Sequence, residues 1–164
     1  MTSVTDGGYR DRILGLVANQ DPIESLGRTI ERVRQTAEKL GGAGLARAYG
    51  PGKWTGAQVL AHLADVEMAI GFRVRQILAE DNHRIQGFDE GAWGKRYDRI
   101  DADAALQSLF ASRRWNLLLL RSLTPEARAR QAIHPDRGPE SLDTVIRLLA
   151  GHDLNHLAQL ESLL

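Results

Sequence analysis

The sequence of 164 residues contains no cysteine, and only 5% of its residues are aromatic. Without cysteine there can be no disulfide bond, no cysteine nucleophile and no thiolate metal ligand. No apolar run approaches the roughly 20 residues that a membrane-spanning helix needs. The N-terminus also lacks a basic segment followed by an apolar core, so we expect no signal peptide and no membrane partner. These features predict a cytoplasmic protein.

No charge of one sign prevails, because 21 basic and 21 acidic residues give a net charge of zero. A protein that binds nucleic acid by neutralising phosphates needs a net basic surface, so we expect no nucleic-acid partner. The hydrophobic content of 43% and the charged content of 26% are typical of globular proteins, and the length suits one domain. We therefore predict a single domain over residues 1–164, with residues 1–8 flexible.

Four stretches place apolar residues at helical spacing between capping and breaking residues. Asp21 followed by Pro22 is typical of a helix start, and Gly41 follows the last periodic residue of that stretch. Thr55 and Ser141 are further N-cap candidates. The predicted long helices span residues 21–40, 55–81, 101–123 and 141–164, with a short helix at 9–18 and a loop at 131–140. Four amphipathic helices predict an all-α four-helix bundle.

The connection over residues 82–100 is too long for a tight turn between two helices. Extended chain covers roughly 3.3 Å per residue, so this segment can return along the whole length of the helix that precedes it. We therefore predict an overhand crossover, which leaves the helices at 55–81 and 101–123 parallel.

The last helix carries polar residues where its inward face should be apolar. Its stripe, in alternating steps of three and four, consists of Leu142, Val145, Leu149, His152, His156, Gln159 and Leu163. A buried imidazole or amide without a partner costs about 1–3 kcal/mol, so three in succession need a reason. The helix at 55–81 shows the same anomaly at His62, among Val59, Leu63 and Val66.

These three histidines predict a metal site. His152 and His156 lie four residues apart, so a helix places them on one face, and His62 comes from a second helix. Three neutral imidazoles suit zinc, nickel, copper or iron(II) and leave a coordination position open, as in catalytic zinc sites. In the alternative interpretation each histidine is hydrogen-bonded within the core or exposed. The sequence leaves both open.

The stretch from His152 to His156 reads HDxxH, close to the HExxH of zinc proteases. Its aspartate is one methylene shorter than the general-base glutamate, and only eight residues follow His156. We therefore expect no zinc protease.

Three other polar residues are candidates for supporting roles around the metal. Asp65 could orient a ligand imidazole, and Gln159 could hydrogen-bond a water on the metal. Arg113 lies on the inner stripe of the helix at 101–123 and could pair with Asp65 or Glu67 or hold an anionic substrate. For each residue a surface or packing role is the alternative, and an arginine so placed more often extends to solvent.

Three segments together resemble the DinB family of metal-dependent proteins, also called DinB/YfiT-like. They are KWTGAQVLAHLADVE (53–67), RQAIHPDRGPESL (130–142) and AGHDLNHLAQL (150–160). The resemblance covers the chain from about residue 20 to its end. It implies an up-down-down-up four-helix bundle, a metal held by His62, His152 and His156, and a homodimer. Relatives in the wider superfamily transfer thiols such as bacillithiol or mycothiol.

Two hypotheses of different classes follow. In the first, the protein is a metal-dependent enzyme, a thiol S-transferase or a hydrolase, which activates a thiol or water for attack on a small electrophilic substrate. The metal would be zinc or nickel, and the thiol would come from a low-molecular-weight cosubstrate because the chain has none. In the second, the protein is a non-catalytic dimeric bundle that binds a metal or a small ligand.

Overall fold

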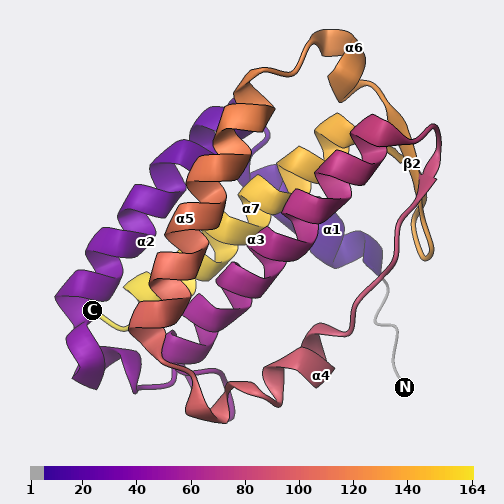
Figure 1. The fold of residues 1–164 in the computed structure, drawn as a ribbon. Coiled ribbons are helices and arrows are strands. Elements are labelled where there is room, and N and C mark those ends of the chain that lie inside the picture. Colours follow the sequence, from indigo (N-terminus) through magenta and orange to yellow (C-terminus); the bar gives the residue numbers. More distant parts are fainter. Residues whose placement is uncertain (1–5) are drawn as a thin grey trace.

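A computed structural model describes residues 6–164, which form a bundle of four long helices (Figure 1). These are α2 (Pro22–Leu45), α3 (Gly56–Ala79), α5 (Ala102–Arg121) and α7 (Leu142–Glu161). Each begins at a residue whose side-chain oxygen accepts hydrogen bonds from backbone N–H groups of the first turn, namely Asp21, Thr55, Asp101 and Ser141. The predicted all-α four-helix bundle is confirmed.

The order of the helices is up-down-down-up. Figure 1 shows α3 and α5 running side by side in the same direction, and α2 and α7 also lie side by side. The connection from α3 to α5 returns along the bundle, so the predicted crossover is confirmed. It is more structured than the sequence indicated. It contains the strand β1 (His83–Arg84), the short helix α4 (Glu90–Gly94) and the 3-10 helix η1 (Tyr97–Arg99).

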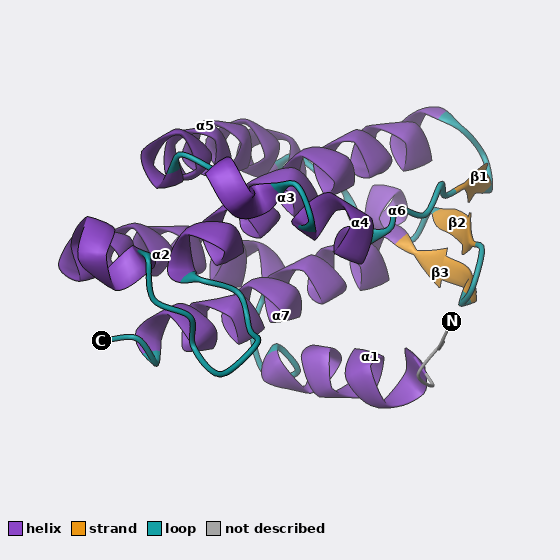
Figure 2. Cartoon of the chain, turned by 90° about the horizontal axis from the view of Figure 1, so that it is seen from below, coloured by secondary structure: helices purple, strands orange, loops and turns teal. Residues whose placement is uncertain are grey.

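A fifth helix, α1 (Asp6–Leu16), packs against α7 outside the ring of four (Figure 2). This helix was predicted at 9–18. Residues 1–8 were predicted to be flexible, but residues 6–8 form the first turn of α1. Residues 1–5 lie outside the described residues. The packing is close at Gly151, where a Cβ would stand 2.1 Å from the backbone oxygen of Ile13. Only glycine allows α1 to approach α7 at this point.

The predicted loop at 131–140 is wrong. This segment forms the antiparallel strands β2 (Gln131–His134) and β3 (Gly138–Ser141), and β1 pairs with β2 in parallel. A four-residue helix, α6 (Pro125–Arg128), precedes them. Pro139 argued against a strand, but β3 lies at the edge of the sheet, where a missing N–H is tolerated. The small sheet closes one end of the bundle (Figure 2).

The predicted end of the first long helix at Gly41 is a break rather than an end. The helix α2 continues to Leu45, but Gly41 adopts a φ of 57°, which interrupts the regular helix. Glycine adopts this left-handed conformation without the steric cost that a side chain would add. The sequence signal was therefore located correctly, and the chain resumes a helix beyond it.

Four large apolar side chains remain exposed on the adjacent helices α3 and α5. Met68, Phe72, Trp115 and Leu118 each have 61–65% of their surface exposed. None of the helices between Asp6 and Glu161 combines the length and apolarity that crossing a bilayer requires.

Candidate metal centre

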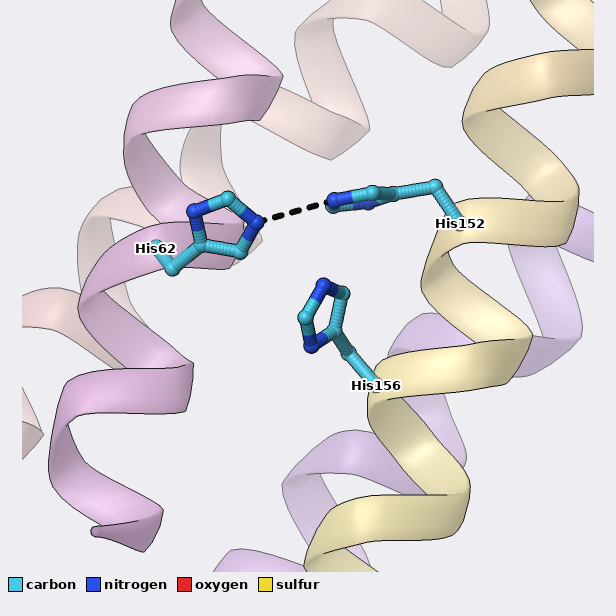
Figure 3. A group of neighbouring side chains, drawn as sticks. All are labelled: His62, His152 and His156. Atoms are coloured by element: carbon cyan, nitrogen blue, oxygen red, sulfur yellow. Dashed lines mark hydrogen bonds between the residues drawn. The ribbon is translucent and has the colours of Figure 1, made fainter. Parts of the chain in front are cut away.

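Three imidazoles converge inside the bundle. His62 comes from α3, and His152 and His156 come from successive turns of α7 (Figure 3). Their exposed fractions are 2%, 8% and 7%. The Nε2 atoms of His62 and His152 lie 2.9 Å apart, and one ring nitrogen from each histidine lies within 4.8 Å of the others. The structure thus brings together all three residues of the predicted metal site, and their ligation of an ion stays a prediction.

The neutral state of His62 and His156 fits a transition-metal ion, since a metal binds the neutral imidazole. Burial and the neighbouring His152 lower the pKa of His62 to about 2. The same two causes lower the pKa of His156 to about 3. Only nitrogen donors meet at this point among the described residues, a set that suits zinc or nickel and not calcium or magnesium.

Two polar side chains lie behind the rings. The Oε1 atom of Gln159 lies 2.7 Å from Nδ1 of His156, so this nitrogen donates and Nε2 keeps its lone pair for the cluster. The Nδ1 atom of His152 is buried without a hydrogen-bond partner, 3.6 Å from Oδ1 of Asp153. Gln159 therefore contacts a histidine directly, which differs from its predicted contact with a water.

Asp65 does not take its predicted role. Its Oδ2 atom accepts a hydrogen bond of 2.7 Å from the hydroxyl of Tyr97, in the crossover. Asp65 therefore anchors η1 to α3 and leaves the imidazole of His62 to other contacts. One such contact is Trp54, whose ring centroid lies 4.8 Å from that of His62 and 6.5 Å from that of His156. This indole covers one side of the histidine cluster.

Arg113 crosses the core of the bundle and is 1% exposed. Its guanidinium group donates to Glu67 at 2.7 Å, to Asp153 at 2.6 Å and to the carbonyl of Leu26 at 3.3 Å. Burial alone would lower the pKa of Arg113, but the two carboxylates outweigh it and raise the pKa. The predicted pairing with Glu67 is confirmed, and the expectation that this arginine extends to solvent is wrong.

The sequence analysis missed Asp153, which joins this ion network to the metal centre. Burial alone would raise the pKa of Asp153, but the charge of Arg113 outweighs this effect and the pKa is lowered. The carboxylate therefore stays ionised. Its spacing was an available signal, since Asp153 lies four residues after the buried Leu149 and four before the buried Leu157. A charged residue on the inner stripe of each of α3, α5 and α7 was the mark of a buried network.

A cleft of about 260 Å³ reaches the cluster at His152. Its walls come from α1, α3, α7, the crossover and the β2–β3 hairpin. A small molecule that entered this cleft would meet His152, the one histidine of the cluster that lines it. His152 is therefore the point where the candidate metal centre is accessible.

The metal-free protein should lose stability as the pH falls below about 6.5, the ordinary pKa of histidine. Below that value the unfolded chain binds protons that folded His62 and His156 do not, because burial holds their folded pKa values at about 2 and 3. Each histidine then costs up to about 1.4 kcal/mol per pH unit. Denaturant unfolding at about pH 7 and pH 5 measures this loss. The loss should shrink in His62→Gln/His156→Gln, and an unchanged loss would contradict the assignment.

Comparisons with known proteins point to the same kind of site. A protein of Oceanobacillus iheyensis named "putative metal-dependent hydrolase" is 33% identical over 159 residues, which cover 94% of this chain and 90% of that protein. YfiT of Bacillus subtilis, which carries the same name, is 33% identical over 147 residues, covering 86% of this chain and 81% of YfiT. Similarity to metal-dependent relatives and the three-histidine cluster together support a metal ion as cofactor.

The fold is shared as well. The solved structure of YfiT, described as a four-helix bundle of unusual topology, superposes with a TM-score of 0.80 and 30% identity. The match covers 87% of this chain and 83% of YfiT. The sequence model of the DinB superfamily matches residues 25–160, which include all three histidines. The chain therefore belongs to the DinB superfamily.

Proposed function

We propose that this protein is a metal-dependent enzyme in which His62, His152 and His156 hold a divalent ion that activates water or a thiol. One observation carries the proposal: the three imidazoles converge where the cleft reaches His152. Three protein ligands leave a coordination position open, and here that position would face the cleft. Zinc and nickel both suit this ligand set.

The residues of the chain have separate roles in this proposal. When bound, the ion would lower the pKa of a water or thiol ligand so that its conjugate base forms near neutral pH. Gln159 holds His156 in the tautomer that binds an ion, and Asp153 lies behind His152. Trp54 packs on His62 and His156 and keeps water from that side.

The names of the relatives support water as the nucleophile. A thiol is supported by the resemblance of the three sequence segments to the DinB family, whose wider superfamily includes thiol transferases. A thiol would have to be a cosubstrate, because the chain contains no cysteine. In either case the substrate is a small electrophile that fits a cleft of about 260 Å³. The two reactions differ only in the group that takes the open position.

The enzyme should turn over electrophiles only when metal and a nucleophile are both present. Zinc- or nickel-loaded protein is incubated with aryl esters or chloronitrobenzenes, with and without bacillithiol, mycothiol, glutathione or coenzyme A. We expect His62→Ala to lower the rate by at least a hundredfold, since one lost ligand disrupts the site. His83→Ala, which changes a histidine outside the cluster, should keep the wild-type rate. Equal rates for His62→Ala and wild type would overturn the proposal.

A non-catalytic role in metal or ligand binding is the alternative, and the ion network supports it. Both carboxylates near the cluster, those of Glu67 and Asp153, are engaged by Arg113, so neither is free as a general base. The predicted homodimer is compatible with this alternative and with the enzymatic function. The exposed apolar side chains of α3 and α5 are the surface that a second copy would cover, and sedimentation equilibrium with Phe72→Glu tests this.

A further inference from the structure

The cleft that reaches His152 has a second, cationic end. Along α7, Val145 and His152 both line it, and along α3 so do Val66 and Arg73. Each pair is seven residues apart, which corresponds to about 10 Å along a helix. At the end away from the histidine cluster, Arg73 meets His134 and Arg137 of the hairpin. The cleft therefore joins His152 of the candidate metal centre to a group of nitrogen donors at its other end.

The two arginines at this end differ in their partners. Arg137 forms a double hydrogen bond with the buried Glu140, at 2.8 and 3.0 Å, so its charge is balanced. Among the side chains that the structure describes, those of residues 8–164, no carboxylate lies within ion-pair distance of Arg73. Its guanidinium group donates to the carbonyl of Gln86, at 3.4 Å, and lies 5.9 Å from the centre of the Phe88 ring. Burial and the nearby Arg137 lower the pKa of Arg73, which means that the cleft destabilises the charged form of this guanidinium group.

His134 adds a neutral donor beside the guanidinium groups. Burial and Arg137 lower its pKa, so the ring is uncharged at neutral pH. Its Nδ1 atom accepts a hydrogen bond of 3.2 Å from the backbone N–H of Asp136, which assigns the ring proton to Nε2. Two acidic residues also line the cleft, Glu90 and Asp136, but both are exposed to solvent. Inside the cleft the uncompensated charge is positive.

The wall between the two ends is apolar. It consists of the side chains of Ile13, Val66, Ile70, Val145 and Leu149. These residues offer no hydrogen bond to a ligand, so they would stabilise only an apolar segment. A ligand that satisfies the whole cleft is therefore anionic at one end and apolar in the middle.

We propose that Arg73, with His134 and Arg137, binds the carboxylate or phosphate of an elongated substrate or cosubstrate whose reacting atom lies at His152. A guanidinium fork matches both anions, and charge-assisted hydrogen bonds in a half-buried site are strong. The position of the reacting atom rests on the proposed function. The anion site does not, because none of its residues belongs to the histidine cluster.

The anion site is tested on metal-free protein by calorimetric titration with octanoate, octyl phosphate and the neutral control octanol. We expect octanoate or octyl phosphate, whichever matches the native group, to bind at least tenfold more tightly than octanol. Arg73→Gln should weaken binding of the preferred anion about ten- to hundredfold and leave octanol unchanged. Arg73→Lys, which keeps the charge but not the fork, should fall between. Arg114→Gln removes the same charge from an exposed position on α5 and should behave as wild type.

Equal binding of the anions and octanol, or wild-type anion affinity in a folded Arg73→Gln variant, would overturn the anion site. The spacing is tested separately with ω-mercaptooctanoate on metal-loaded protein. If the thiol sits at the metal while the carboxylate meets Arg73, it should bind more tightly than octanoate and than the shorter mercaptopropanoate. If octanoate binds through Arg73 but the protein retains no metal, the anion site stands and the proposed enzymatic function fails.

Discussion

Replacing Arg113 with methionine should lower the free energy of unfolding by about 3–5 kcal/mol, because the change leaves two buried carboxylates without their cation. The ionised carboxylates of Glu67 and Asp153 can only accept hydrogen bonds, so they need a donor. The two residues are 0% and 4% exposed, so water cannot replace the guanidinium group as that donor. Arg113 also holds the carbonyl of Leu26, and through these contacts α5 binds α2, α3 and α7 at one level of the bundle.

Guanidinium chloride unfolding measures this loss, with Arg114→Met as the matched control. Arg114 is exposed on α5, so its replacement should change stability by less than about 0.5 kcal/mol. Arg113→Met/Glu67→Gln/Asp153→Asn, which removes all three charges together, should recover much of the loss, since the penalty arises from unpaired charge. A loss below about 1 kcal/mol for the single variant would contradict the role assigned to the network.

Alanine at any one of the three cluster histidines should weaken metal binding by more than about a hundredfold. Loss of an outer partner alone typically costs about 10–100-fold, and loss of a ligand costs more. Gln159→Leu should therefore show the smaller effect, because it removes only the contact with Nδ1 of His156. His83, which contacts Glu80 outside the cluster, provides the control.

Competition with a chelator gives these affinities, and elemental analysis of untagged protein gives the stoichiometry. We expect one equivalent of metal in the wild type and in His83→Ala after supplementation. The far-UV circular dichroism of each variant shows whether it remains folded. One equivalent retained with wild-type affinity by folded His62→Ala, His152→Ala and His156→Ala variants would show that the ion binds elsewhere.

Helix caps and apolar spacing were sufficient to predict the bundle. Asp21, Thr55 and Ser141 cap helices as their positions indicated, because capping is a local interaction between a side chain and the next turn. The convergence of His62 with His152 and His156 was predictable for a similar reason. An inward stripe on two neighbouring helices can only point into the shared core.

The hairpin and the ion network were harder to predict. Residues 131–134 pair along their whole length with the neighbouring β3, and Ala132 and Ile133 also pair with β1, about fifty positions earlier, but Pro139 concealed the edge strand. The inner-stripe spacing marks Glu67, Arg113 and Asp153 singly, whereas their ion pairs join three helices that are distant in sequence. Arg73 drew no attention in the sequence, since the surroundings of its guanidinium group are a property of the folded cleft.

The up-down-down-up order has a consequence for how quickly the chain reaches its native state. Helices that follow one another in sequence, α2 with α3 and α5 with α7, lie on the diagonals of the bundle. The adjacent helices α2 and α7, by contrast, stand at opposite ends of the chain. Few pairs of helices can therefore assemble as local helical hairpins. The chain loses most of its loop-closure entropy before contacts between distant helices compensate for that loss. We expect this bundle to fold more slowly than an up-and-down bundle of equal size, with a rate closer to that of mixed α/β domains.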